Sequence, residues 1–244
     1  MHTLNDWLAT PQGQYVLRWE LAKHEVLLND IFGFNAVQIG LPGQDYLAGN
    51  RMPFRFHCAT EGAVHTLADA HQLPFASCSI DLVVLPHVLE FDPDPHRILR
   101  EIDRVLVPEG HVVVTGFNPF SLWGARQRIR RDKEDAPWNG RYIGVSRLKD
   151  WFALLGFETR AGAFGCYAPA FGSERNLQRF RFMEPAGDRW WGFAGAVYIM
   201  QGIKRQHGMR LLTAPWHDRK LRAKAMVTVT QRVDNEGGAM RVEQ

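Results

Sequence analysis

The chain has 244 residues, of which 45% are hydrophobic and 23% are charged. This length and composition suit one globular α/β domain with a sizeable core, and they exclude a fibrous or an intrinsically disordered protein. The chain contains no run of eighteen apolar residues, and its start has no basic segment followed by an apolar one. We therefore expect a cytoplasmic protein with no membrane partner.

The formal net charge of +3 is spread unevenly along the chain. Residues 200–244 hold nine Lys and Arg against four Asp and Glu, a local excess of +5. Apolar periodicity fades after residue 203, so we predict one domain over 1–203 and a poorly ordered basic C-terminal tail over 204–244. Such a tail permits a nucleic-acid partner without requiring one.

The cysteine and histidine patterns give no sign of a disulfide framework or a metal site. Cys58, Cys78 and Cys166 are odd in number and widely spaced, which predicts free thiols. No two histidines stand four residues apart with an acid between them, as a helical metal motif requires. We therefore predict no metal.

Helices and strands are predicted to alternate along the chain. Apolar spacing predicts a helix over 7–32 that ends at Gly33, and then a buried strand over 35–40 that enters a turn. Further strands are expected over 53–58, 79–85 and 111–115, with a helix over 94–106 before the last of these. Ser146 is predicted to cap a helix that Gly156 ends, and a late strand is expected over 194–203.

Strands that alternate with helices at this spacing imply a mostly parallel sheet joined by right-handed crossovers. The predicted fold class is therefore α/β, Rossmann-like and doubly wound, with helices on both faces of the sheet.

Four motifs follow one another within residues 69–110. They read Asp69-Ala70-His71-Gln72-Leu73-Pro74-Phe75, Ser79-Ile80-Asp81-Leu82-Val83, His87, and Leu99-Arg100-Glu101 through Pro108-Glu109-Gly110. In this order they resemble the D-A-x-x-L-P-F, S-F-D-x-V, post-strand histidine and L-R-E-x-x-R-V-L-x-P-G-G of small-molecule-type class I S-adenosylmethionine-dependent methyltransferases. The chain is most similar to the methyltransferase-11-like group, in a little-characterised bacterial branch. The resemblance implies a seven-stranded sheet and S-adenosylmethionine as cofactor.

The resemblance places the cofactor at the carboxyl ends of the strands, over the turn that follows the first strand. Where the family has an acid two residues before G-x-G-x-G, this chain has Gln38, and only the first glycine, Gly40, aligns. Where the family has a ribose-binding acid, the chain has His57 or Cys58, with Glu61 a little beyond. The predicted cofactor-binding residues are Gln38, Gly40, Leu41, Gly43, His57, Asp69, Ala70 and Pro86, with Asp69 and Ala70 at the adenine.

Pro42 stands where the family has its second glycine, and it lacks a backbone N–H. Replacing Pro42 with Gly is therefore predicted to tighten cofactor binding, and adding Gln38→Asp to tighten it further. This expectation fails if the Leu41-Pro42 pair has a compensating geometry, because glycine would then only add chain entropy.

The same residues also suit a protein without a ligand. The 40–43 turn suits a plain strand end, Asp69 an ordinary solvated acid, and His87 a cover for the end of a strand. The basic run over 126–133 suits a solvated, partly helical face. Candidates for taking a proton from a methyl acceptor are His87, Asn118 and Tyr142.

The leading hypothesis is in-line transfer of a methyl group from S-adenosylmethionine to a small-molecule acceptor. One alternative is a non-catalytic protein that keeps the fold but has a degenerate cofactor loop and acts through protein contacts. A third hypothesis is an RNA methyltransferase that uses the basic excess and stacks bases on aromatic residues such as Trp138, Trp190, Trp191 and Trp216. A nicotinamide dehydrogenase is disfavoured because G-x-G-x-x-G is absent.

Overall fold

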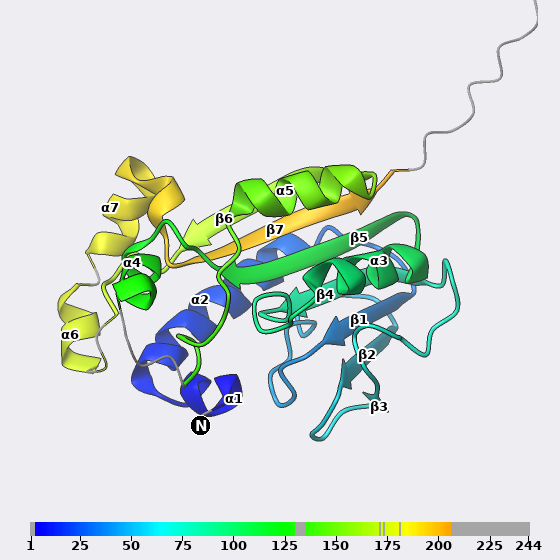
Figure 1. Cartoon of the computed structure of the whole chain (residues 1–244), viewed down its shortest axis with the longest axis horizontal. Coiled ribbons are helices and arrows are strands. Elements are labelled where there is room, and N and C mark those ends of the chain that lie inside the picture. Colours follow the sequence, from blue (N-terminus) through cyan, green and yellow to red (C-terminus); the bar gives the residue numbers. More distant parts are fainter. Residues whose placement is uncertain (1–2, 130–134, 171, 173, 181, 206–244) are drawn as a thin grey trace, which may run out of the picture. The chain divides into compact units, whose positions relative to one another are not determined.

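The computed structural model describes residues 3–129, 135–170, 172, 174–180 and 182–205. In this part of the chain seven strands form one sheet in the order β3-β2-β1-β4-β5-β7-β6 (Figure 1). The first five strands in the chain run parallel, and β7 runs antiparallel to both of its neighbours. The strands are β1 (Asn35–Ile39), β2 (Phe54–Ala59), β3 (Thr66–Leu67), β4 (Ile80–Pro86), β5 (Leu106–Phe117), β6 (Phe157–Gly165) and β7 (Val197–Lys204). The predicted fold class is thereby confirmed.

Helices cover both faces of the sheet, as predicted. They are α1 (Leu4–Leu8), α2 (Pro11–Leu28), α3 (Pro95–Val105), α4 (Leu122–Ile129), α5 (Val145–Leu154), α6 (Glu174–Arg179), α7 (Met183–Trp190) and the short 3₁₀ helix η1 (Gly192–Ala194). One core cluster joins α1 and α2 to one face, and a second joins α3 and α5 to the other (Figure 1). In β4, Leu82 and Val84 face the first cluster, whereas Val83 and Leu85 face the second. The continuous apolar run in the sequence follows from this burial on both faces.

The single helix predicted over 7–32 is wrong, because two helices, α1 and α2, occupy this region. The break falls where Thr10 caps α2 by accepting a hydrogen bond from the backbone N–H of Gly13 at 3.1 Å. Pro11 then takes the first helical position, where its missing N–H has no cost. Phe32 lies beyond the end of α2, and 73% of its surface is exposed.

Other predicted boundaries also differ from the structure. Ser146 lies inside α5 and is not its cap, because Gly144 occupies the N-cap position without a side-chain bond. Strand β5 begins at Leu106 and not at residue 111, because Leu106 already pairs with Ile80 before an irregularity in the ladder. Strand β7 begins at Val197 because η1 occupies residues 192–194. Helices α6 and α7 had no predicted counterpart.

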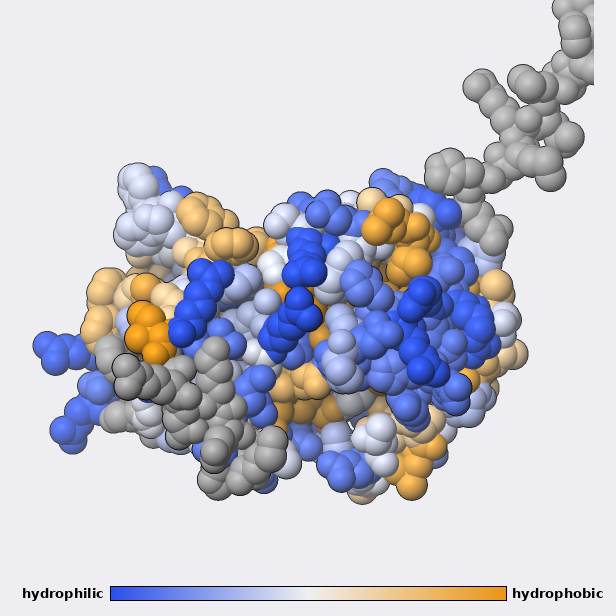
Figure 2. Space-filling model, in the orientation of Figure 1, coloured by the Kyte–Doolittle hydropathy of each residue, from blue (hydrophilic) through white to orange (hydrophobic). Residues whose placement is uncertain are grey.

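The tail predicted over 204–244 lies outside the described residues, except for Lys204 and Arg205. The three cysteines are free thiols in the structure. Within the described ranges, no helix is both long and apolar enough to cross a membrane. Figure 2 shows a mostly hydrophilic surface on the face in view, with separate apolar patches.

Candidate functional site

A pocket of about 450 Å³ lies at the carboxyl ends of β1 and β4. The chain leaves β1 toward β2 and β3 on one side and later continues from β4 to β5 on the other, so these strands flank the switch point of the sheet. The volume is in the usual range for small-molecule sites. We call this cavity the strand-end pocket; its lining residues are Thr3, Leu4, Gly40, Leu41, Pro86, His87, Val88, Phe91, Asp92, Ala136 and Asn139.

The turn after β1 has its own geometry. Gln44 donates its backbone N–H to the carbonyl of Leu41 at 3.3 Å, and Gly43 has a φ of 93°. Proline at the second position and a positive φ at the third are the signature of a type II turn. Pro42 also packs against Gly62, where a Cβ would lie 2.8 Å from the proline ring. Pro42 therefore has a specific place in this turn, and the effect of Pro42→Gly on cofactor binding stays a prediction.

Gln38 holds this turn from the inside. Its buried amide nitrogen donates to the carbonyl oxygens of Gly40, Leu41 and Gln44 at 3.2, 3.4 and 2.7 Å. Its amide oxygen accepts the backbone N–H of Tyr46 at 2.8 Å. A carboxylate could not donate to three carbonyls. The glutamine therefore belongs to a differently shaped turn, and the structure gives no support for the expected benefit of Gln38→Asp.

The predicted adenine residues lie after β3 and do not line the strand-end pocket. The exposed carboxylate of Asp69 accepts hydrogen bonds from the backbone N–H and the ring Nδ1 of His71, at 2.9 and 2.7 Å. These bonds lower the pKa of Asp69. The other ring nitrogen of His71 lies 3.0 Å from Asp92, which does line the pocket. His71 therefore connects the predicted adenine site with the strand-end pocket.

No acid stands at the end of β2. Cys58 is fully buried there, and Glu61 is exposed beyond the strand. His57 instead lies 3.3 Å from the carboxylate of Asp45, which comes from the segment after β1. Asp45 lies in the segment after β1 and not on the second strand, where the family pattern has its acid. The β1–β2 ladder pairs His57 with Gln38, and no local sequence signal places Asp45 beside His57.

A buried charged cluster lies directly behind the pocket wall. His87 is 2% exposed; its Nε2 lies 2.6 Å from Glu20 Oε1, and its Nδ1 bonds to Glu90. The second oxygen of Glu20 accepts the hydroxyl of Tyr46 at 2.6 Å, and the second oxygen of Glu90 accepts the backbone N–H of Phe117 at 2.8 Å. Burial lowers the pKa of His87, but the two carboxylates outweigh burial and raise it to about 10.

A second cavity of about 500 Å³ adjoins the first. Ala136 lines both, and helix α1 contributes Leu4 to one and Trp7 to the other. We call this cavity the side pocket; its lining residues are Asp6, Trp7, Thr10, Pro11, Gln12, Arg126, Asp135, Ala136, Trp138, Ala170 and Gly172. The Arg126 guanidinium lies 5.2 Å from the centre of a Trp138 ring. The amide nitrogen of Gln12 is buried, with no hydrogen-bond partner in the described part of the chain.

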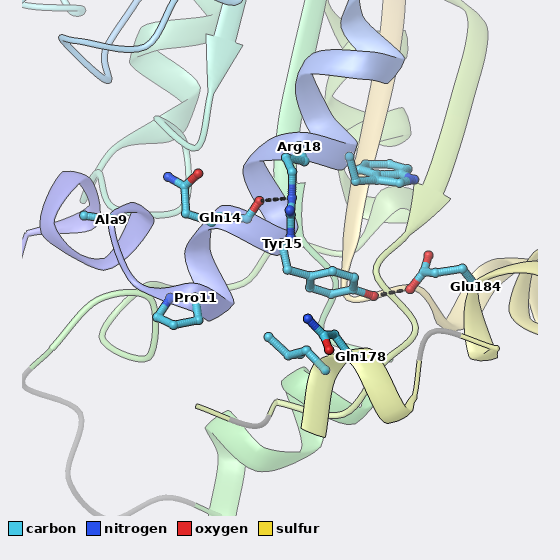
Figure 3. A pocket seen from close by; sticks show the side chains of 9 residues that line it. Ala9, Pro11, Gln14, Tyr15, Arg18, Gln178 and Glu184 are labelled. Carbon is cyan, nitrogen blue, oxygen red and sulfur yellow. Dashed lines mark hydrogen bonds between the residues drawn. The ribbon is translucent and has the colours of Figure 1, made fainter. Parts of the chain in front are cut away.

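A larger cavity of about 730 Å³ lies elsewhere, between the start of α2 and helices α6 and α7 (Figure 3). The Tyr15 hydroxyl donates to Glu184 at its edge, and Arg18 and Gln178 line it (Figure 3). It shares no lining residue with the strand-end pocket. Its size alone does not make it the functional site, because none of its lining residues lies at the β1–β4 switch point.

The sequence is similar to that of known methyltransferases over part of its length. Residues 51–114 match the methyltransferase domain family. The chain is 37% identical over 130 residues to the uncharacterised protein YafS of Escherichia coli K12, covering 52% of this chain and 54% of that one. It is 27% identical over 147 residues to a malonyl-[acyl-carrier protein] O-methyltransferase of Methylovorus sp. MP688, covering 59% and 49%. The chain thus spans about half the length of these curated relatives.

Solved structures decide the fold. A S-adenosylmethionine-dependent methyltransferase of Thermotoga maritima superposes with a TM-score of 0.59 at 20% identity, covering 78% of this chain and 92% of that one. Geranyl diphosphate C-methyltransferase of Streptomyces coelicolor, in complex with S-adenosyl-L-homocysteine, gives a TM-score of 0.54 at 12% identity, covering 77% and 81%. The fold is that of a class I methyltransferase. The family match confirms the sequence resemblance over residues 51–114.

Only some of the predicted cofactor residues meet at one place in this fold. Gly40, Leu41 and Pro86 line the strand-end pocket. Gln38 and Gly43 shape the turn beside it, while His57, Asp69 and Ala70 lie outside its lining. Sequence reasoning did not identify Glu20, Asp45, Glu90 or Asp92 as part of the site.

The three candidates for proton transfer differ in what their polar atoms do. Both ring nitrogens of His87 are bonded to carboxylates, so neither is free to take a proton. Asn118 donates to the carbonyls of Phe193 and Gly195 at 2.8 and 2.9 Å, which ties the end of β5 to the segment before β7. The buried hydroxyl of Tyr142 has no hydrogen-bond partner among the described residues. The geometry therefore leaves Tyr142 as the candidate with a free polar atom.

Gln38→Glu is expected to destabilise the domain by about 1–3 kcal/mol, because three carbonyls of the turn lose their donor and face a carboxylate. Urea unfolding of the purified variant measures this loss. Gln44→Glu is the matched control, since it adds the same charge to the same turn while keeping the backbone carbonyl that Gln38 binds. Equal stability of the Gln38→Glu variant and the wild type would contradict the assigned role of the amide.

The raised pKa of His87 predicts a pH dependence of stability. Because the pKa rises from 6.5 to about 10 on folding, the stabilisation is fully present below pH 6.5 and is lost as pH rises through about 10. Burial lowers the pKa of neighbouring His24 to about 4, so this residue stays neutral over the same interval. Urea midpoints of wild type should fall between pH 6.5 and 10.

The control for this titration is His87→Gln. It should be less stable by about 3–5 kcal/mol near neutral pH, because it breaks a buried charge pair. Its urea midpoints should then fall less between pH 6.5 and 10 than those of wild type. Parallel pH profiles for the two proteins would show that His87 does not carry the dependence.

Proposed function

We propose that the chain transfers a methyl group from S-adenosylmethionine to a small-molecule acceptor in the cytoplasm. The observation that carries the proposal is the strand-end pocket, which opens at the β1–β4 switch point where α/β sheets of this kind bind ligands. The residues present fit the cofactor. Gly40 has a φ of 83° and no room for a Cβ, and the carboxylate of Asp92 stands in the wall.

The chain's own residues then have distinct roles. Gly40 and Leu41, held by Gln38, form the wall beside the methionine part of the cofactor. Asp69 stands near the adenine, and the Asp45–His57 pair takes the place of the absent ribose acid. The cofactor supplies an electrophilic methyl group on a sulfonium. The protein's contribution to in-line displacement is chiefly to position the acceptor and to exclude water.

The side pocket supports a small polar acceptor. It adjoins the strand-end pocket at Ala136, and it offers the unpaired amide nitrogen of Gln12 and the guanidinium of Arg126 as donors beside the Trp138 rings. Hydrogen-bond donors suit an acceptor that carries oxygen. The Methylovorus relative is by name an O-methyltransferase. Burial raises the pKa of Tyr142, so its hydroxyl keeps its proton and would donate a hydrogen bond to the acceptor oxygen.

One observation favours the alternative of a non-catalytic protein. The backbone N–H of Gly40 is already bonded to the carbonyl of Cys58 at 2.8 Å, and Pro42 has no N–H to offer. The turn therefore presents fewer donors than a glycine-rich loop does. The RNA hypothesis gains only the exposed rings of Trp190 and Trp191, because Trp138 is buried and the basic tail with Trp216 lies outside the described residues.

Calorimetric titration with S-adenosylmethionine separates the enzyme from the non-catalytic protein. We expect micromolar binding by the wild type and binding at least about tenfold weaker in Gly40→Ala. The added Cβ would lie 2.8 Å from Val88, on a backbone that favours glycine. Gly192→Ala is the matched control, since a Cβ there meets no atom within 4 Å. Absent or millimolar binding by the wild type would reverse the proposal in favour of the non-catalytic protein.

A further inference from the structure

The wall of the strand-end pocket carries an unbalanced buried charge. His87, one of the lining residues, is an imidazolium bonded to the two carboxylates of Glu20 and Glu90. Two negative charges and one positive charge leave a net charge of −1. In the described part of the chain, no Lys or Arg side chain bonds to either glutamate, and the groups that do are the Tyr46 hydroxyl and the Phe117 N–H.

The two carboxylates of this cluster are shielded from water. Glu20 is 0% exposed and Glu90 is 3% exposed, so protein and not water surrounds both carboxylates. Buried charges interact more strongly than exposed ones because the effective dielectric constant is lower, and salt screens them less. Both ring nitrogens of His87 bond to the glutamates, so His87 has no ring N–H left to donate to a ligand. A cation in the strand-end pocket is therefore stabilised relative to a neutral group of the same shape.

We propose that the Glu20–His87–Glu90 cluster makes the strand-end pocket prefer a cationic methyl donor over its neutral demethylated product. This inference rests on the proposed function. In the transfer, a lone pair of the acceptor forms the new bond to the methyl carbon, and the carbon–sulfur bond breaks with its electrons returning to sulfur. The sulfonium becomes a neutral thioether, and the attraction that held the donor disappears. Glu20 and Glu90 thus determine ligand charge specificity without touching the reacting atoms.

A purely structural role is the competing explanation. The cluster also joins α2 to the ends of β4 and β5, through Glu20 on α2, His87 after β4 and the bond from Glu90 to Phe117 on β5. Both explanations predict that loss of a glutamate lowers stability. They differ in the ligand affinities that they predict. A structural defect weakens the binding of all ligands alike, whereas loss of the charge weakens the binding of cationic ligands only.

The test compares three ligands by calorimetry. They are S-adenosylmethionine, neutral S-adenosylhomocysteine, and an analogue with an ammonium in place of the sulfonium. Glu20→Gln and Glu90→Gln each remove one charge at nearly constant shape, and either variant suffices if the other fails to fold. Asp81→Asn is the matched control: it removes a carboxylate at the start of β4, the opposite end from the pocket, where Asp81 accepts the backbone N–H groups of Phe34 and Asn35.

We expect affinity for both cationic ligands to fall about tenfold relative to the neutral one in each glutamine variant, a difference of about 1.4 kcal/mol. The ratio should stay at the wild-type value in Asp81→Asn. If all three ligands weaken equally, or if the ratio does not change, the inference is overturned while the proposed function stands. If the wild type binds none of the ligands, the proposed function fails, and the inference fails with it.

Discussion

A protonated histidine held between two buried glutamates is the interaction on which the site depends. Its partners come from separate parts of the chain: Glu20 lies 67 positions before His87, on helix α2, and Glu90 follows three positions after it. His87 itself has a φ of 53°, in the left-handed region that non-glycine residues rarely adopt. Its backbone N–H bonds to the carbonyl of Thr115 on β5 at 3.0 Å. The cluster therefore fixes the N-terminal helices against the ends of the two central strands.

The surrounding chain is shaped to accommodate this cluster. A Cβ on Gly116 would lie 3.1 Å from Glu90 and 2.8 Å from the hydroxyl of Tyr198, so this strand position requires glycine. The centre of the Phe117 ring lies 4.4 Å from the centre of the His87 ring and 5.1 Å from the centre of the Tyr142 ring. The charged cluster, the end of β5 and the packed aromatic rings thus support one another. Together they place Tyr142, whose hydroxyl has no partner among the described residues, near the cluster.

Much of the fold could be predicted from the sequence because its signals are local. The β-branched run of β4, the apolar stripe of α3 and the four ordered motifs over 69–110 each reflect residues close together in the chain. Gly40, Leu41 and Pro86 could be assigned to the site because they follow strands whose ends meet at one edge of the sheet. The break between α1 and α2 was readable in Thr10-Pro11 but was overridden by apolar spacing on either side.

The rest depends on contacts between distant segments. Glu20 looks like an ordinary helical acid until α2 is packed on the sheet, and Asp45 gains its meaning only beside His57 on the neighbouring strand. Gln38 was interpreted as a weakened acid, whereas it donates to three carbonyls of a turn whose shape no local pattern gives. The roles of these side chains follow from their hydrogen-bond and ion-pair partners, which lie far from them in the sequence or in a turn of unusual shape.

The most direct measurement of the central claim is a crystal structure of the protein with S-adenosylhomocysteine. The account predicts the ligand in the strand-end pocket, with its sulfur beside His87, its methionine part along Gly40 and Leu41, and its adenine toward Asp69 and Ala70. A ligand found instead in the cavity between α2 and α6, or a strand-end pocket that stays empty at saturating ligand, would contradict it.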